Sequence, residues 1–179
     1  MSEVNENLRK MKMRVEITEL TDFSMHHRVP ATMSYLNDQP DSRLFTYTQG
    51  DCYLINDDKD DKTVILAYEY EGAREGNRTI KVTQHSDGKY TISVVTIGEM
   101  HSRQTYQEDE WYSEQYFFAG KSMVLRNYTN SIHVHKFPEY AMITCEYELW
   151  SGESHMGYHI FNLVVGFTSE ADSMKFMIT

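Results

Sequence analysis

The sequence predicts a mostly β protein that folds as an eight-stranded, antiparallel up-and-down barrel. Tyr, Val, Ile and Thr recur in short alternating runs, and the chain contains 13 tyrosines, a composition that favours strands over helices. Asp87-Gly88 lies between two such runs and is the strongest hairpin signal in the chain. A barrel removes exposed sheet edges by closing on itself, and eight strands leave room inside for side chains or one small ligand. A β-sandwich would show the same alternation and is the structural alternative.

Eight segments have the length and the composition of strands. Polar or acidic stretches separate them, among them residues 56–62 and 106–114, which we interpret as solvated loops. No linker or internal repeat divides the chain, so its 179 residues predict a single domain over 1–179. The predicted strands cover residues 52–56, 63–72, 78–84, 90–98, 115–120, 122–129, 131–137 and 141–150.

Both ends of the chain are predicted to be helical. Apolar residues between positions 4 and 15 recur at spacings of four, three and four, which suits a short amphipathic N-terminal helix. Apolar residues of 156–167 also follow a helical spacing, and Ser151 or Ser154 could cap that helix. We expect the C-terminal helix to pack against the outside of the sheet.

Composition and charge exclude several classes of partner. The net charge of −10 argues against binding to nucleic acid or to an anionic membrane, because both require a cationic face. No run of 18 apolar residues exists, so we expect no membrane insertion. The first residues do not form a signal peptide, which leaves an intracellular protein or a mature secreted chain. The sequons at Asn77 and Asn127 favour secretion and are predicted glycosylation sites.

Residues 144–153, TCEYELWSGE, form the most informative stretch for function. Alternation along a strand places Glu146, Glu148 and Trp150 on one face and the residues between them on the other. On the outside of a protein this acidic face would be ordinary. If it points inward, a carboxylate beside an indole would suit an amine, or a hydroxyl on an otherwise apolar ligand.

Three stretches resemble the tick salivary lipocalins, the histamine-binding-protein family. They are YELW at 147–150, GDCYLINDDKDDKTVILAYEY at 50–70 and RNYTNSIHVHKF at 126–137, and the resemblance covers about residues 46–167. It implies a secreted lipocalin-like barrel with a ligand cavity, which modulates host immune or inflammatory responses, as in the Japanin-type immunomodulatory branch. A host immune-cell receptor is then an expected partner, and we expect the protein to be a monomer.

The resemblance also implies a ligand site. Glu148 and Trp150 match the carboxylate and indole that line the cavity of amine-binding members, but Val124 stands where those members carry an aspartate. A cation site that has lost an anion has lost part of its attraction. We therefore expect a sterol or lipid with one hydroxyl, such as cholesterol, rather than histamine or serotonin. The apolar lining is predicted to include Val124, Phe118, Leu66 and Tyr68, subject to a shift of one residue in strand parity.

Cys52 matches the family's early cysteine, which implies a disulfide with Cys145 on the outer wall. Such a long closed loop would stabilise the fold by roughly 4 kcal/mol on the loop-entropy model. Two free buried cysteines are the alternative, and they would indicate the cytosol.

The sequence favours a binding protein over an enzyme. It contains no nucleophile elbow, phosphate-binding loop or paired-carboxylate pattern, so we expect no catalytic residues and no catalytic cofactor. His133 and His135 share a strand face, but no third ligand lies at a suitable spacing, and no metal site is predicted. Two alternatives stay open: a lipocalin that sequesters a biogenic amine, and a β-sandwich immune modulator that acts by protein contact alone.

Overall fold

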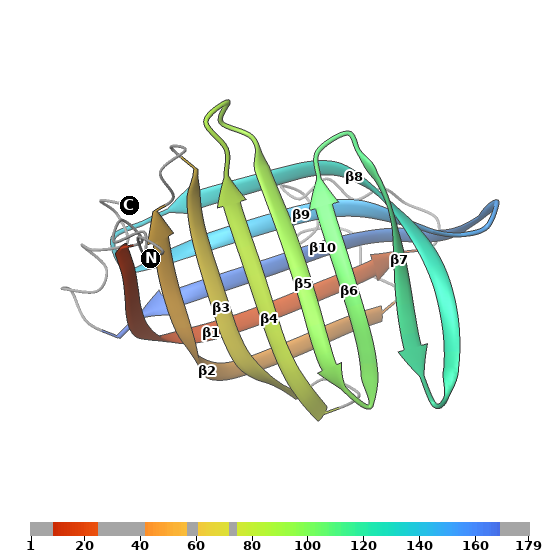
Figure 1. Cartoon of the computed structure of the whole chain (residues 1–179), viewed down its shortest axis with the longest axis horizontal. Helices are drawn as coiled ribbons and strands as arrows, with labels where there is room; N and C mark the ends of the chain where they lie inside the picture. The colour runs from red at the N-terminus through yellow and green to blue at the C-terminus, as the bar shows by residue number, and fades with distance from the viewer. Residues whose placement is uncertain (1–8, 25–41, 57–60, 72–74, 169–179) are drawn as a thin grey trace, which may run out of the picture.

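Ten antiparallel strands form one closed barrel (Figure 1). The computed structural model describes residues 9–24, 42–56, 61–71 and 75–168. Consecutive strands pair from β1 to β10, and β1 closes the barrel by pairing with β10 as well as β2. The strands are β1 (Arg9–Ser24), β2 (Ser42–Asn56), β3 (Lys62–Glu71), β4 (Glu75–Gln84), β5 (Tyr90–Gly98), β6 (Met100–Gln107), β7 (Trp111–Phe118), β8 (Lys121–Lys136), β9 (Tyr140–Ser151) and β10 (Ser154–Phe167).

The two predicted helices are wrong wherever the structure describes them. From Arg9 onward the N-terminal segment is β1, and the whole predicted C-terminal helix is β10. In β10, Leu163 and Val165 point inward, while Ile160 on the outer face is also only 5% exposed. A strand with apolar residues on both faces places some of them three and four positions apart, and this spacing imitates a helix. Within the described ranges no helix is long and apolar enough to span a lipid bilayer.

The predicted count of eight strands is wrong for a second reason. Residues 122–129 and 131–137 belong to one strand, β8, in which a bulge near Asn130 shifts the register against β9. Residues 100–107, read partly as an acidic loop, form β6. The predicted hairpin at Asp87-Gly88 is confirmed, because these residues turn between β4 and β5 with Gly88 at a φ of 85°. A mostly β, antiparallel barrel is therefore correct, with ten strands.

The interior is arranged in cross-strand rows, since paired residues on neighbouring strands point to the same side. Two rows are apolar: Cys52, Leu66, Ile80 and Val94, and next to it Leu54, Val64, Val82 and Ile92. The following row is polar on the same strands. We call it the polar row, and it consists of Tyr68, Arg78, Thr96, Ser102 and Tyr116.

β2 pairs with both β1 and β3 from Asn56 to Gly50, and with β1 alone beyond Gly50. Its ladder with β3 ends at the pair of Gly50 and Tyr68, whereas its ladder with β1 continues to Ser42. A Cβ atom at Gly50 would lie 2.6 Å from Cδ1 of Ile17 and 2.8 Å from the carbonyl oxygen of Ala67, so only glycine fits this close approach. The strand bends here, and β3 to β7 run steeply across β8 to β10 and β1 (Figure 1). The bend leaves a fork in the barrel wall between β2 and β3.

Candidate ligand-binding site

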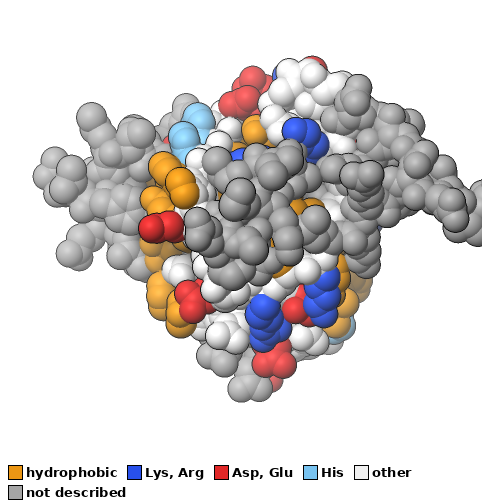
Figure 2. Space-filling view, turned by 90° about the vertical axis from the view of Figure 1, so that its left-hand side faces the viewer, with side chains coloured by type: hydrophobic (Ala, Val, Ile, Leu, Met, Phe, Trp, Pro, Cys, Tyr) orange, Lys and Arg blue, Asp and Glu red, His pale blue; other side chains and the backbone are white. Residues whose placement is uncertain are grey.

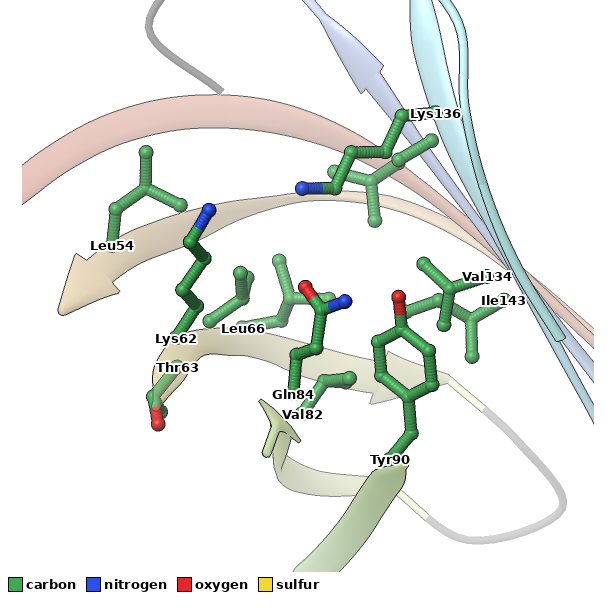
Figure 3. Close-up of a pocket in the computed structure, with 13 residues that line it drawn as sticks. Leu54, Lys62, Thr63, Leu66, Val82, Gln84, Tyr90, Val134, Lys136 and Ile143 are labelled. Atoms are coloured by element: carbon green, nitrogen blue, oxygen red, sulfur yellow. The ribbon is translucent and has the colours of Figure 1, made fainter. Parts of the chain in front are cut away.

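An apolar pocket opens at one end of the barrel, where β2, β4, β8 and β10 end and β3, β5 and β9 begin. We call this end the mouth. Water-sized atoms could occupy about 40 Å³ of the pocket. Leu54, Leu66 and Val82 from one side and Val134 and Ile143 from the other form its walls (Figure 3). The pocket therefore lies where the two apolar rows of the interior reach the mouth.

Two lysines stand at the rim of this pocket. Lys62 begins β3 and Lys136 ends β8, and Figure 3 shows both ammonium groups turned toward the same space. Partial burial, and then the charge of Lys62, lower the pKa of Lys136 below its ordinary value. Figure 2, which views this end of the molecule, shows hydrophobic side chains together with Lys or Arg and Asp or Glu side chains on the surface. The rim therefore combines positive charge with apolar surface in a protein of net charge −10.

Gln84 and Tyr90 supply uncharged polar groups beside the lysines. Gln84 pairs with Lys62 across β3 and β4, and Tyr90 pairs with Gln84 across β4 and β5, so the three belong to one inner row. Burial raises the pKa of the Tyr90 hydroxyl, which therefore stays a neutral donor and acceptor. The mouth offers two cations, an amide and a phenol above an apolar floor.

The other end of the interior is polar. Glu19 is 3% exposed, and its carboxylate accepts hydrogen bonds from the Tyr68 hydroxyl and from the Arg78 guanidinium. A buried carboxylate requires such partners, because an unpaired one costs several kcal/mol. Nearby, the Tyr147 and His159 rings stack at 4.9 Å, and burial lowers the pKa of His159 to about 4.

The structure separates the predicted ligand-binding residues into two groups. Leu66 and Tyr68 point into the barrel, one in the wall of the mouth pocket and one in the polar row. Val124 is 57% exposed and Phe118 is 40% exposed, so neither is enclosed. Val124 pairs with Gln115 on the outer face of β7 and β8.

Glu148 and Trp150 lie on the outside, contrary to the predicted inward face. Their strand neighbours Cys145 and Tyr147 belong to the core, so alternation directs Glu148 and Trp150 outward. The Glu148 carboxylate is 3.5 Å from Nε2 of His155, and the Trp150 ring is 4.8 Å from the His155 ring. They form part of an outer aromatic cluster and not the polar end of a cavity.

The predicted disulfide is not formed. Cys52 in β2 and Cys145 in β9 are both buried, free thiols. Burial raises the pKa of the Cys52 thiol to about 12 and raises that of Cys145 as well, so both stay protonated and unreactive. The alternative of two free buried cysteines describes the structure.

The two predicted glycosylation sites have opposite environments. Asn77 is exposed on β4. Asn127 is 1% exposed and points into the barrel, so the folded protein has no room for a glycan there. The prediction for Asn127 is corrected for this reason.

Sequence reasoning missed the residues that give both ends of the interior their charge. Lys62 has the same parity as Val64 and Leu66, and Lys136 has the same parity as Val134 and Ile132. Arg78 and Glu19 likewise continue the inward faces of their strands. A charged residue that continues an inward apolar series was the available signal, and it was not used.

The family model described as "Domain of unknown function (DUF1934)" matches residues 35–163. The barrel is similar to the crystal structure of the ywiB protein from Bacillus subtilis, with a TM-score of 0.59 and 15% sequence identity, over 91% of this chain and 96% of that chain. At this identity the likeness concerns the fold alone. None of the curated protein sequences matches the chain significantly.

These findings overturn the resemblance to tick salivary lipocalins. The matching family is a different one, and strands occupy the places where helices were predicted. The immune role and the histamine-binding relationship depended on the resemblance and lose their support. The family model covers well over half of the chain, and the chain therefore belongs to the DUF1934 family.

Proposed function

We propose that this protein binds a small amphipathic anion at the mouth of the barrel, without catalysing a reaction. The apolar part of the ligand lies against Leu66 and Val82, and its carboxylate or similar head lies between Lys62 and Lys136. The observation that carries the proposal is the convergence of two ammonium groups over an apolar pocket.

Electrostatics support an anionic head over the amine of the alternative hypothesis. Two like charges at one rim repel each other, and the charge of Lys62 adds to partial burial, the larger cause, in lowering the pKa of Lys136. A bound anion would be attracted by both ammonium groups and would offset their mutual repulsion. Charge-assisted hydrogen bonds from ammonium groups are also among the strongest available. An organic cation would meet the same repulsion that the lysines exert on each other.

The size of the pocket favours a short ligand. Pockets for drug-sized molecules occupy roughly 300–1,000 Å³. The pocket at the mouth offers about 40 Å³ to water-sized atoms, enough for only a few carbons beyond the head group. This volume supports a short-chain anion better than cholesterol or another sterol, whose rigid ring system requires a larger cavity.

The test is a calorimetric titration with straight-chain carboxylates of increasing length. Each methylene buried in the pocket is expected to tighten binding about fourfold, since burial of a CH₂ contributes about 0.8 kcal/mol. The gain should stop once the pocket is full. A neutral alcohol of the same length should bind more weakly, because it lacks the charge that the lysines attract.

Matched variants locate the site. The double variant Lys62→Gln/Lys136→Gln is expected to weaken carboxylate binding at least tenfold, given about 1.5–3 kcal/mol for hydrogen bonds to charged groups. Lys81→Gln, at an exposed position of β4 outside the pocket lining, removes a similar charge and should change little. Equal affinity for acid and alcohol, or equal losses in both variants, would contradict the proposal.

A further inference from the structure

The part of β2 that precedes Gly50 forms an open edge of the barrel wall. Residues 44–49 pair with β1, but no described strand pairs with them on the other side, because the ladder with β3 ends at Gly50 and Tyr68. Figure 1 shows β2 as the outermost strand beside β1, β10, β9 and β8. Alternate residues of an antiparallel strand direct their N–H and C=O groups to the same side. Half of this segment therefore offers its backbone groups to one more strand.

The side of β2 that β3 leaves is also open in space. A hollow of about 440 Å³ is lined by Thr48 and Gln49 of β2 and by Glu69 and Asn77 of β3 and β4. Glu69 and Asn77 pair with each other, so β3 and β4 continue together beyond the point where β2 leaves them. The hollow gives an arriving strand access to the backbone of β2.

Large apolar side chains are concentrated on this edge. Phe45 is 61% exposed and Tyr47 is 58% exposed, the two highest values for large hydrophobic residues in the described part of the chain, and Leu44 is exposed as well. Phe45 and Tyr47 share the outer face, since Thr46 between them is buried. Contiguous apolar residues on a surface mark an interaction site, whereas single ones are normal.

A second open edge, in β8, is protected in ways that the edge of β2 is not. Among the described strands, residues 131–136 pair only with β9. That edge carries a bulge near Asn130 and the exposed polar side chains of His135 and Lys136. Bulges and charged side chains, above all lysine, prevent edge-to-edge pairing in natural sheets. Residues 44–49, LFTYTQ, contain no charged residue and no proline, and their ladder with β1 has no bulge.

We propose that the edge of β2 pairs with the same edge of a second copy of this chain, so that the sheet continues across a two-fold axis. Such a pair is antiparallel, and with Thr46 at the axis Phe45 of one copy lies directly opposite Tyr47 of the other. This aromatic pair occurs twice, once on each side of the axis. The segment that meets itself is uncharged, so the contact brings no like charges together in a protein of net charge −10.

The self-complementary placement of Phe45 and Tyr47 favours a second copy over an unrelated peptide as the occupant of this edge. The proposal departs from the expectation of a monomer, which came with the resemblance. It is independent of the anion proposed for the mouth, because the mouth uses other residues.

Sedimentation equilibrium of the full chain tests the proposal, from about 1 μM to about 1 mM, the range of weak and moderate association. A reversible equilibrium between monomer and dimer is expected. At high concentration, amide hydrogen exchange should slow at alternate residues of 44–49, whose N–H groups enter the new ladder. The mass of a monomer at every concentration overturns the proposal.

Two double variants test the register. Phe45→Lys/Tyr47→Lys places lysine opposite lysine in the dimer and should raise its dissociation constant at least tenfold. Phe45→Lys/Tyr47→Glu places lysine opposite glutamate at the same positions, so it should weaken the dimer much less. Both positions are exposed, and both variants should unfold near the Tm of the unmodified protein. Equal losses in the two variants overturn the proposed register.

Ile97→Lys/Val124→Lys is the matched control. It adds the same charge at two positions of β5 and β8 that are 55% and 57% exposed. The dissociation constant should stay within about twofold of its original value, which excludes a general effect of net charge. A dimer that this control weakens as much as Phe45→Lys/Tyr47→Lys does, or that neither β2 variant weakens, overturns the proposal.

Discussion

The two ends of the barrel interior are built from the same strands but have opposite chemistry. At the mouth, Lys62 and Lys136 bring like charges together above apolar walls. At the polar end, Glu19 and Arg78 bring opposite charges together where water is nearly absent. The first arrangement gathers two charges of one sign, whereas the second pairs two charges of opposite sign.

This difference shows that each cross-strand row has its own chemistry. Within β3, moving from Lys62 through Leu66 to Tyr68 changes the environment from cationic to apolar to hydrogen-bonding. All three point inward because side chains alternate with a period of two. Substitutions at the two ends are therefore expected to act by different physical mechanisms.

The largest effect is expected at the polar end. Arg78→Met leaves the buried Glu19 carboxylate without its cation, and breaking a buried ion pair in this way costs about 3–5 kcal/mol. The double variant Glu19→Gln/Arg78→Met removes both charges and should recover most of that loss. Urea unfolding measures both. A double variant as unstable as the single one would show that the charges are not coupled.

The apolar rows between the two ends should respond through cavity formation. Leu66 is fully buried, so Leu66→Ala is expected to lower the free energy of unfolding by about 2–5 kcal/mol. Val124→Ala is the control, because Val124 is 57% exposed and its loss should cost less than about 0.5 kcal/mol. Equal losses in urea unfolding would mean that Val124 faces a core.

Acid should destabilise the polar end through His159. Its pKa is about 4 when folded, against 6.5 as the ordinary value, so below pH 6.5 the unfolded state binds more protons. This stability is present above pH 6.5 and is lost as the pH falls toward 4, with a loss of about 2 kcal/mol between pH 7 and 5. His159→Phe keeps the stack on Tyr147 and removes the titration. Its unfolding curves should depend less on pH in this range, and an unchanged dependence would assign the effect to other groups.

The β content and one hairpin could be predicted because their signals are local. Asp87-Gly88 specifies a tight turn between strands, and the alternation of Tyr68, Glu69, Tyr70 and Glu71 at the end of β3 indicates the parity of that strand. The inward direction of Leu66 and Tyr68 was accessible in this way. The residues of β1 and β8 that face them inside the barrel could not be predicted, because contacts between strands far apart in the sequence leave no local pattern.

The inner face of β9 could not be predicted from alternation. Glu146 and Tyr147 are consecutive and are 8% and 7% exposed, so both faces of this strand are buried. Bulges near Asn130 in β8 and between His155 and Gly157 in β10 then shift the parity of the neighbouring strands. A stretch that is buried on both sides allows either assignment, and TCEYELWSGE was assigned to the wrong side.

The smallest effect is expected at the mouth, where the change should stabilise the protein. Lys62→Glu replaces a repulsion by an attraction, so it should raise the pKa of Lys136 and add up to about 1 kcal/mol of stability, the usual limit for an exposed pair. The same variant should abolish carboxylate binding, because the pocket rim no longer carries an excess of positive charge. Urea unfolding measures the change in stability, and NMR titration of Lys136 measures the change in its pKa. Lys62→Gln should give an intermediate value for each. If Lys62→Glu left the pKa of Lys136 unchanged, the two ammonium groups would not share the space above the pocket, and the contrast between the ends of the barrel would rest on the polar end alone.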